Sequence, residues 1–402
     1  MLKILLVSNL YPNINEPTRG VFTEQIVEKL SNRHLVEVVA PTPWFPKILN
    51  RSFKLGHKYI PDECVRKNIK VYHPQYLVIP KVGRWLYGFL FFLGIWSTLR
   101  KVKKNFNPDV INVHWMYPDA FATVLAAKLL KIPVVTHSLG CDINEFSKYR
   151  SRRYFIKKAL KFADYNISVS DELKKKTISL GANPKTAITI MNGVNGLIFK
   201  PGNKLLLRED LNLPLDKKLF LYAGNFNVEK GLEVLIRAFS LMHLENPEAR
   251  LVIVGSGPLE HRISCVVQEL DISEKLIFVG RVNHQTIAKY LTAADFLCLP
   301  SLREGCPNIV LESLASGTPV LASSVGAIPQ MLSSDNGLLG LEAKPNDIAD
   351  LTRVLSLSLS IEWPQNLDFK WMDWQQSSDE IAGVLLKAST LNNKRNKYEA
   401  PK

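Results

Sequence analysis

The sequence predicts an α/β protein built from two doubly wound domains that face a central cleft. Apolar runs of strand length alternate with amphipathic stretches of helix length along most of the chain, which is the pattern of parallel sheets covered by helices. The chain has 402 residues, more than one hydrophobic core usually organises. Hydrophobic residues make up 46% and charged residues 22%, which excludes a largely disordered protein.

The first half of the chain opens with a predicted buried strand and continues with alternating helices and strands. Strands are expected over residues 3–8, 36–40, 110–113, 134–137 and 165–169. Helices are expected between them, for example over residues 21–30, 120–130 and 155–162. Turn residues dominate from 192 to 218, so the first domain is predicted to span residues 1–200.

The second half resumes the same alternation and forms the second predicted domain, residues 201–362. Its strands are expected over residues 219–224, 250–255, 276–280, 296–300 and 319–323. The polar end, residues 391–402, is expected to be disordered. Open parallel sheets bind ligands at the carboxyl ends of their strands, so functional residues are expected just after strands, in the cleft between the domains.

The basic charge is confined to one half of the chain. Residues 1–200 hold 31 Lys and Arg against 13 Asp and Glu, whereas residues 201–402 hold 20 against 24. A basic half favours a polyanionic partner: nucleic acid, anionic lipid headgroups or a phosphorylated substrate. The excess is spread over the whole half and no nucleic-acid recognition motif occurs, so nucleic acid ranks last of the three.

The five cysteines and the amino-terminal segment bear on the compartment. Their odd number and the lack of any C-x-x-C pair indicate reduced thiols, as in the cytosol. The apolar run at Leu2–Ser8 is too short for a signal peptide and is typical of a buried strand. A cytoplasmic protein is therefore expected.

One apolar run, Trp85–Leu99, has two interpretations. It holds fifteen uncharged residues between Arg84 and Arg100, too few to cross a hydrocarbon core of ~30 Å at ~1.5 Å per residue. It is either a buried helix packed on a sheet or an interfacial helix whose basic flanks hold anionic lipid. The basic first half favours the second, so we expect peripheral contact with the anionic inner-membrane surface.

The densest group of candidate site residues runs from Glu304 to Glu312. It follows the predicted strand 296–300 and opens a helix closed by Gly317, so that backbone amides near Asn308–Val310 form an anion site suited to a diphosphate. Either glutamate alone would be explained as a charge that complements the helix dipole. The pair is better explained as hydrogen-bond acceptors for sugar hydroxyls.

A second loop, Gly224–Gly231, follows the first strand of the second domain. Lys230 ends this turn, from where its ammonium can reach phosphate oxygens, although a solvated surface lysine is the plainer alternative.

The first domain offers candidates in the same position relative to its strands. Gly20 follows the opening strand and would let backbone approach a ligand. His137 ends the fourth predicted strand beside a Gly turn and is expected to face the cleft, although a lone histidine is usually structural. Asp142 and His114 are weaker candidates on the acceptor side.

Several common motifs are absent from the sequence. The segment Gly255-Ser-Gly257 lacks the third glycine of the dinucleotide fingerprint, and no G-x-x-x-x-G-K-[ST] occurs. No H-E-x-x-H, clustered Cys and His, or Asp-x-Asp pair is present. No metal site and no cofactor are therefore expected, and Lys230 with helix N-termini would meet the charge of a leaving diphosphate.

Taken together, these segments resemble glycosyltransferase family 4, the retaining nucleotide-sugar transferases of GT-B fold with two Rossmann-like domains. The resemblance runs nearly the full chain and is most specific in PSLREGCPNIVLESLASGTPV from Pro300 to Val320, which matches the family's E-x7-E signature. Within the family the chain is most similar to bacterial enzymes that build cell-surface or capsular polysaccharides. The other matching segments are the Gly20 loop, THSLGCD at Thr136, NGVN at Asn192, EKG at Lys230 and VGSGP at Val254.

The resemblance implies a role for each matching residue. Glu304 would bind the donor sugar's hydroxyls, Glu312 the ribose, and His137 the transferred sugar. The amides of Pro307 to Val310, with Lys230, would hold the diphosphate. The segment 363–390 would form the closing helix that crosses back to the first domain. The family commonly has Arg where this chain has Asn225. The guanidinium that would bind the diphosphate is therefore missing, and Arg281 or Arg303 would compensate for its loss. The implied donor-binding set is Gly20, Asn225, Lys230, Arg281, Glu304, Gly305, Pro307, Asn308, Ile309, Val310 and Glu312, with Glu304, His137 and Lys230 as its catalytic members.

The expected function is transfer of a hexose, with retention, from a UDP- or GDP-sugar to a lipid-linked or polysaccharide-precursor acceptor at the cytoplasmic face of the membrane. A phosphate oxygen would take the acceptor's proton on the face that the diphosphate leaves; a covalent route through a carboxylate is the alternative. A GT-B enzyme that transfers nothing, such as a nucleotide-sugar epimerase, is the second hypothesis.

Overall fold

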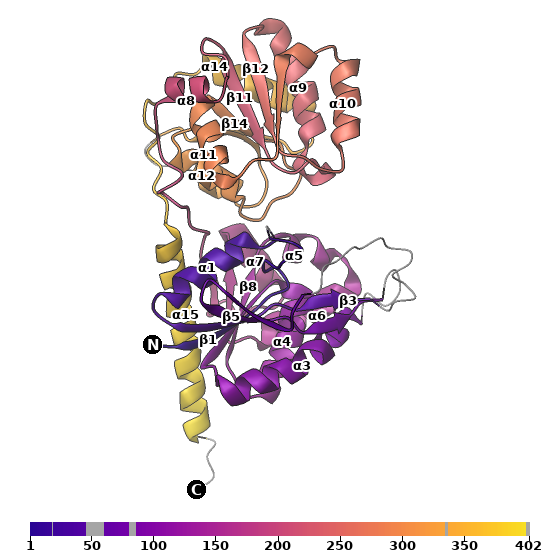
Figure 1. The fold of residues 1–402 in the computed structure, drawn as a ribbon, viewed down its shortest axis with the longest axis vertical. Coiled ribbons are helices and arrows are strands. Elements are labelled where there is room, and N and C mark those ends of the chain that lie inside the picture. Colours follow the sequence, from indigo (N-terminus) through magenta and orange to yellow (C-terminus); the bar gives the residue numbers. More distant parts are fainter. Residues whose placement is uncertain (18, 46–59, 80–85, 334–336, 399–402) are drawn as a thin grey trace. The chain divides into compact units, whose positions relative to one another are not determined.

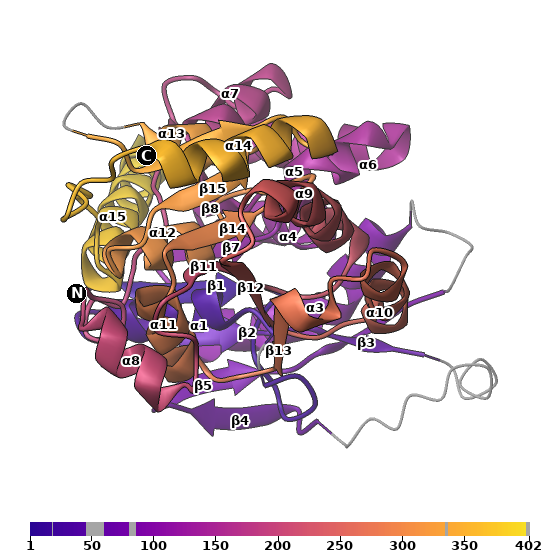
Figure 2. The ribbon, with the colours of Figure 1, turned by 90° about the horizontal axis from the view of Figure 1, so that it is seen from above.

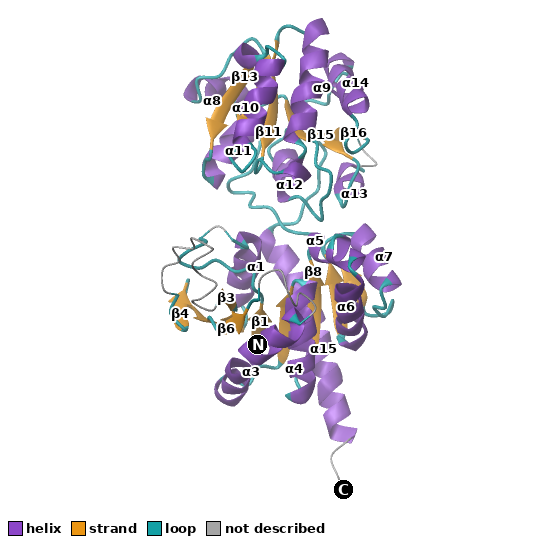
Figure 3. Cartoon of the chain, turned by 90° about the vertical axis from the view of Figure 1, so that its right-hand side faces the viewer, coloured by secondary structure: helices purple, strands orange, loops and turns teal. Residues whose placement is uncertain are grey.

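The computed structural model describes residues 1–402 except 18, 46–59, 80–85, 334–336 and 399–402. The chain forms two compact units. The first comprises Met1–Asn192 together with Trp374–Lys402, and the second comprises Gly193–Asp373. Each unit is a sheet covered by helices, as expected of doubly wound domains (Figures 1 and 3).

The first unit contains an eight-stranded sheet in the order β10-β9-β8-β7-β1-β2-β5-β4. All neighbouring strands are parallel except β4, which pairs antiparallel with β5 at one edge. A separate parallel pair is formed by β3 and β6. The strands are β1 (Lys3–Val7), β2 (Leu35–Val39), β3 (Thr42–Trp44), β4 (Glu63–Arg66), β5 (Ile69–Tyr72), β6 (Gln75–Leu77), β7 (Val110–His114), β8 (Val134–Ser138), β9 (Tyr165–Ser168) and β10 (Ala187–Thr189).

Helices cover this sheet, and the last one comes from the far end of the chain. Helix α15 packs along α1 and against β7 and β8 (Figure 1), and its Trp374, Ile381, Leu385 and Ala388 belong to the first unit's core. The helical segments are α1 (Val21–Ser31), α3 (Tyr87–Asn105), the π-helix η1 (Met116–Ala120), α4 (Phe121–Leu129), α5 (Cys141–Asn144), the 3-10 turn η2 (Phe146–Lys148), α6 (Arg150–Phe162), α7 (Asp171–Ser179) and α15 (Trp374–Tyr398).

The carboxyl-terminal segment differs in its bounds from the sequence expectation. The helix was expected over 363–390 with a disordered tail from 391, whereas α15 begins at Trp374 and continues to Tyr398. Residues 361–373 contain no helix, and Val194 pairs with Asp373 in an isolated parallel bridge. The backbone amide of Val194 also donates to the carbonyl of Met372 at 2.9 Å.

The apolar run that the sequence placed at Trp85–Leu99 belongs to helix α3. Trp85 itself lies outside the described residues, and the helix continues to Asn105. One face of α3, with Phe91, Ile95 and Leu99, is fully buried against α4 and β6, as in the packed-helix interpretation. The other side leaves Phe89 41% and Leu93 66% exposed. No helix within the described ranges is both long and apolar enough to span a membrane.

The second unit contains a six-stranded parallel sheet in the order β13-β12-β11-β14-β15-β16, of which β13 to β15 are labelled in Figure 2. The strands are β11 (Lys218–Ala223), β12 (Ala249–Val254), β13 (Leu276–Gly280), β14 (Phe296–Leu299), β15 (Val320–Ser323) and β16 (Gly340–Ala343). The helical segments are α8 (Lys204–Asp210), the 3-10 turn η3 (Val228–Lys230), α9 (Leu232–Glu245), α10 (Glu260–Glu269), the 3-10 turn η4 (Ser273–Lys275), α11 (His284–Ala293), α12 (Asn308–Ala315), α13 (Ile328–Leu332) and α14 (Ile348–Ser360).

Candidate functional site

The second unit brings Lys230 and Glu304 together. Lys230 follows β11 and Glu304 follows β14, and these two strands are hydrogen-bonded neighbours whose carboxyl ends share one edge of the sheet. Lys230 Nζ lies 2.6 Å from Glu304 Oε1, and the hydroxyl of Ser301 donates to the same oxygen at 2.7 Å. The Glu304 side chain is 10% exposed and that of Lys230 28%, so the pair is largely withdrawn from solvent.

The turn that carries Lys230 is fixed on both sides. The side-chain oxygen of Asn227 accepts a hydrogen bond from the Lys230 amide at 3.2 Å. Gly231 follows with φ of 64°, and a Cβ there would lie 2.1 Å from the carbonyl oxygen of Pro300. Only glycine fits this contact, which presses the turn against the end of β14 and so aims Lys230 at Glu304.

The loop that carries Glu304 is braced by the loop after the next strand, β15. A Cβ on Gly326, whose φ is 61°, would lie 2.5 Å from the carbonyl oxygen of Glu304. The amide of Ala327 donates to the carbonyl of Gly305 at 2.8 Å. Both contacts hold the backbone of Glu304 and Gly305 in place, which restricts where the carboxylate can point.

Glu312 lies one turn into α12, is 9% exposed and has no side-chain hydrogen bond to any described residue. Burial raises the pKa of this carboxyl to about 7, because nothing in the surroundings compensates for the lost hydration of the charge. A buried carboxyl with open acceptor positions is suited to bind hydroxyl groups.

The amino terminus of α12 provides fewer amides than the sequence analysis assumed. Pro307 is the N-cap residue and has no N–H, so it cannot donate to an anion. The amide of Val310 donates to the carbonyl of Pro307 at 3.0 Å. The anion site is therefore narrower than the four-residue set expected from Pro307 to Val310, with Asn308 and Ile309 in the first turn.

Asn225 and Arg281 also follow strands at this edge of the sheet. Asn225 is exposed, and its backbone carbonyl accepts a hydrogen bond from the Tyr222 hydroxyl at 3.0 Å. Arg281 follows β13 and donates to the Ser256 hydroxyl. The segment around Gly255 packs on the same loop, since a Cβ on Gly255 would lie 1.9 Å from the carbonyl of Gly224.

In the first unit, His114 and His137 lie side by side at the ends of β7 and β8. The two residues are paired in register and their rings are 4.5 Å apart, nearly perpendicular. Neither ring nitrogen of His137 has a hydrogen-bond partner among the described residues, and burial lowers its pKa to about 3. His114 lies 2.9 Å from Asn112 and 3.4 Å from Thr23, and burial lowers its pKa as well. Both imidazoles are therefore neutral near pH 7.

Asp142, the acceptor-side candidate of the sequence, is engaged with backbone amides in the structure. Its carboxylate accepts hydrogen bonds from the amides of Met116, Leu139, Gly140 and Ile143 at 2.8–3.1 Å. Burial nevertheless raises its pKa to about 6, with the amides acting in the opposite direction. The carboxylate thereby ties the segment after β7 to the turn after β8.

Asp119 in η1 is a further buried carboxyl of the first unit, and it is not among the candidates expected from the sequence. It accepts hydrogen bonds from the backbone amide and the side-chain amide of Asn9 at 2.6 and 2.9 Å, and burial raises its pKa. An Asp just before the apolar segment 121–129 was the available signal, since such residues often precede helices.

Gly20 lies close to the loop after β1. Its φ is 65°, and a Cβ on this residue would lie 2.2 Å from the carbonyl oxygen of Leu10. Thr18, in the same loop, lies outside the described residues.

No three His, Cys, Asp or Glu side chains of the described ranges are grouped so that they could hold a metal ion. No disulfide bond joins any of the five cysteines, Cys64, Cys141, Cys265, Cys298 and Cys306, all of which lie within the described residues.

Two sequence families match the chain, one for each half. "Glycosyltransferase Family 4" matches residues 20–195, and "Glycosyl transferases group 1" matches residues 203–369. TuaC of Bacillus subtilis (strain 168), assigned to teichuronic acid biosynthesis as a glycosyltransferase, is 28% identical over 345 residues, which are 84% of this chain and 85% of TuaC. N-acetyl-alpha-D-glucosaminyl L-malate synthase of Bacillus anthracis is 26% identical over 64% of this chain and 68% of that protein.

Solved structures share the fold. Sucrose-phosphate synthase of Thermosynechococcus elongatus matches with a TM-score of 0.71 and 20% identity over the whole of both chains. HepE of Anabaena in complex with UDP matches with a TM-score of 0.68 and 15% identity over 99% of both chains.

Proposed function

The chain belongs to the retaining glycosyltransferases of family 4, which have the GT-B fold, and we propose that it transfers a hexose from a UDP- or GDP-sugar to a lipid-linked or polysaccharide-precursor acceptor. The observation that carries the proposal is the Lys230–Glu304 pair at one edge of the second unit's sheet, followed along the same loop by α12 with the buried Glu312. It combines a cation for a diphosphate with two carboxyls for hydroxyl groups, which is the chemistry that a nucleotide sugar requires.

Each residue of this group has a distinct role in the proposal. Glu312 accepts hydrogen bonds from the ribose hydroxyls, and Glu304 accepts them from the transferred sugar. Lys230, held 2.6 Å from Glu304, neutralises the diphosphate beside that sugar. The first turn of α12 adds partial positive charge from its exposed amide ends.

In the proposed reaction the bond between the anomeric carbon and the diphosphate oxygen breaks, and its electron pair stays on the diphosphate. The acceptor oxygen bonds to the same face of the anomeric carbon, and its proton passes to a diphosphate oxygen. Lys230 stabilises the charge on the leaving group without a metal ion. A sugar found covalently attached to Glu304 would refute this route in favour of a two-step one.

The first unit contributes His137 to the proposal. Its imidazole is neutral and its nitrogens have no partner among the described residues, so it can donate or accept one hydrogen bond with a substrate hydroxyl. His114 beside it is held by Asn112, and Asp142 holds the turn that follows His137. Both act as positioning residues for His137.

We also propose that the first unit rests on the cytoplasmic face of an anionic membrane. Phe89, Phe121 and Phe155 line an apolar groove of about 320 Å³ between α3, α4 and α6. Lys128 and Lys158 lie at the same groove, and both stack over the ring of Phe162. Phe89 and Phe162 at this groove are 41% and 42% exposed, and exposed apolar rings beside lysines favour contact with acyl chains and anionic headgroups. Similarity to TuaC supports an acceptor in cell-surface polysaccharide synthesis.

A donor panel tests the proposal. UDP-, GDP- and ADP-sugars are added without metal to the wild type, to Glu312→Ala and to the exposed control Glu342→Ala, and thermal stabilisation and donor hydrolysis are measured. We expect one nucleotide class to stabilise the wild type and the control but not Glu312→Ala. No response from folded wild-type protein to any donor would refute the donor site, and conversion of a donor to its epimer without acceptor would favour the epimerase hypothesis.

A further inference from the structure

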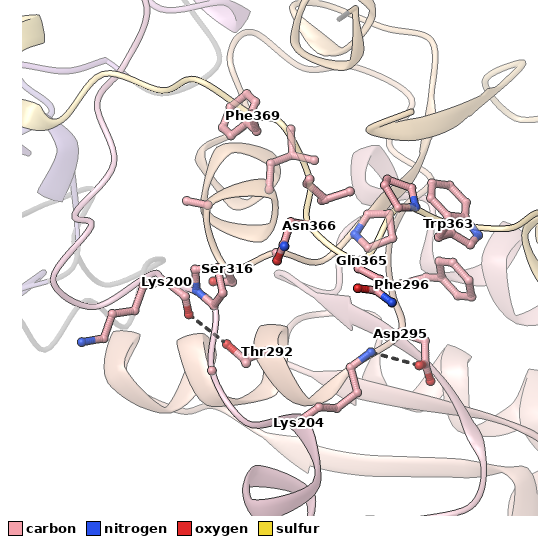
Figure 4. Close-up of a pocket in the computed structure, with 18 of the residues that line it drawn as sticks. Lys200, Lys204, Thr292, Asp295, Phe296, Ser316, Trp363, Gln365, Asn366 and Phe369 are labelled. Carbon is pink, nitrogen blue, oxygen red and sulfur yellow. Dashed lines mark hydrogen bonds and ion pairs between the residues drawn. The ribbon is translucent and has the colours of Figure 1, made fainter. Parts of the chain in front are cut away.

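The second unit has a cavity of about 540 Å³ (Figure 4). It lies at the edge of the sheet opposite to the edge that carries Lys230 and Glu304. Lys218, Phe296 and Pro319 line it where β11, β14 and β15 begin. Lys230 and Glu304 follow the far ends of β11 and β14, and a strand rises about 3.3 Å per residue. Strands of four to six residues therefore separate the two sites by roughly 13–20 Å, so one ligand cannot fill both.

The loop of residues 363–371 covers this cavity and supplies fixed aromatic rings. Trp363 donates its indole N–H to the carbonyl of Ser358 at 2.8 Å and packs against Phe296, with ring centroids 5.4 Å apart. The Trp371 ring lies against Gly196, where a Cβ would come within 2.1 Å of it. Rings held in this way lose no freedom when the apolar face of a sugar ring stacks on them.

Two side-chain amides lie on the same loop. Gln365 and Asn366 line the cavity and make no side-chain hydrogen bond with any described residue. In Figure 4 both amides lie between Ser316 and Phe296. Each amide can donate and accept, which matches hydroxyl groups that also do both.

The lysines that could meet an anion lie at the rim of the cavity. The acidic residue among its described lining, Asp295, is engaged by Lys204 at 3.1 Å, by Arg208 at 2.7 Å and by the amide of Leu219 at 2.8 Å. Lys200 and Lys218 are exposed, and their ammonium groups make no ion pair with any described residue. Figure 4 shows the Lys200 side chain directed away from Gln365 and Asn366, so its ammonium would meet an anion at the rim and not inside the cavity.

The cavity favours a single carboxylate over a phosphate cluster. Leu314, Ala315 and Ser316, which line it, form the carboxyl end of α12. That end of a helix carries partial negative charge and repels a multiply charged diphosphate more strongly than one carboxylate. Aromatic rings, amides and two ammonium groups together are the chemistry that recognises a uronic acid.

We propose that this cavity is a second carbohydrate site, which binds a uronic acid unit of an acidic polysaccharide chain, apart from the donor site. The proposal rests on the proposed function in that the bound chain is the polymer on which the enzyme acts. Binding there would keep a growing chain attached to the second unit between successive transfers. Its affinity would then not depend on whether the donor site is filled.

Titration calorimetry on the full chain tests this site. Tetragalacturonate and the neutral maltotetraose are titrated in the presence of saturating UDP, so that the donor site is occupied. We expect saturable binding of one tetragalacturonate and at least about tenfold weaker binding of maltotetraose, because charge-assisted hydrogen bonds to the lysines are lost.

Two double variants separate the cavity from general charge. Lys200→Ala with Lys218→Ala is expected to weaken tetragalacturonate binding about tenfold or more. Lys275→Ala with Lys344→Ala removes the same charge from positions that do not line the cavity and is expected to leave the binding unchanged. Asn366→Ala, which leaves the charge intact, is expected to weaken binding of the same ligand.

Three results would overturn the site: no binding of tetragalacturonate, equal losses in the two double variants, or displacement of tetragalacturonate by UDP. UDP binding is measured separately by thermal stabilisation. Failure of the donor site therefore appears as loss of UDP stabilisation with tetragalacturonate still bound, and failure of the second site appears as the reverse.

Discussion

Replacing Glu312 with glutamine tests both the burial of this carboxyl and its role. The folded protein raises the Glu312 pKa from the ordinary 4.5 to about 7, so ionisation is less favourable in the folded state than in the unfolded chain. The buried carboxyl therefore lowers the free energy of unfolding. This destabilisation is small below pH 4.5, grows between pH 4.5 and 7, and is constant above pH 7. With about 1.36 kcal/mol per pK unit, the full difference is about 3 kcal/mol.

Glu312→Gln has nearly the same shape and never ionises. We therefore expect the unliganded variant to be more stable than the wild type by about 3 kcal/mol at pH 8 and by about 1 kcal/mol at pH 5. The assay is urea unfolding at both pH values, followed by tryptophan fluorescence, with Glu342→Gln as the exposed control. The same variant should bind the donor nucleotide more weakly, because an amide replaces one carboxyl acceptor pair.

Two results would refute this reasoning. An equal stability difference at pH 5 and pH 8 would mean that Glu312 ionises as easily in the folded protein as in the unfolded chain. A stabilised variant with unchanged donor affinity would mean that the buried carboxyl does not contact the nucleotide.

Further substitutions address the rest of the two units. Lys230→Ala leaves Glu304 without its ammonium partner and should lower kcat at least about tenfold, measured as initial transfer rates, while Lys289→Ala should not. Gly231→Ala forces a side chain into the Pro300 carbonyl and should destabilise the protein by roughly 1–3 kcal/mol in urea unfolding; an unchanged midpoint would refute the close contact. Asp142→Asn loses charged acceptors for four amides and should destabilise the first unit by about 1–3 kcal/mol, measured likewise. Leu93→Glu should reduce flotation with phosphatidylglycerol vesicles, and Leu244→Glu should not, although Leu244 on α9 is 79% exposed against 66% for Leu93.

The sequence predicted the central strands of both sheets because these strands are buried on both faces and appear as continuous apolar runs. Strands β4 and β5 were missed because both are short and interrupted by charged residues: Glu63–Arg66 begins and ends with one, and Ile69–Tyr72 contains Lys70. Strand β16 was missed for a similar reason, because Gly340–Ala343 is short and half-buried.

The candidate site could be predicted only in part. A spacing of eight residues placed Glu304 and Glu312 on one loop and helix, and both lie there. The burial of Glu312 depends on what packs over α12 and has no local signal. The role of Asp142 depends on the amide of Met116, which belongs to another loop, so adjacent sequence could not reveal it. The amide contribution of Pro307 could have been excluded from the sequence, since proline has no N–H.

The docking of α15 on the first unit affects how the chain folds during synthesis. Six residues of α15 complete a core whose other buried members lie before residue 191: Trp374, Ile381, Ala382, Val384, Leu385 and Ala388. Ser377 of the same helix donates to the carbonyl of Met191 at 2.8 Å. A ribosome finishes residues 1–192 long before it makes α15, so the nascent first unit has an uncovered apolar face while the second unit is being made. The second unit is continuous in sequence, so it can fold before the first unit is complete.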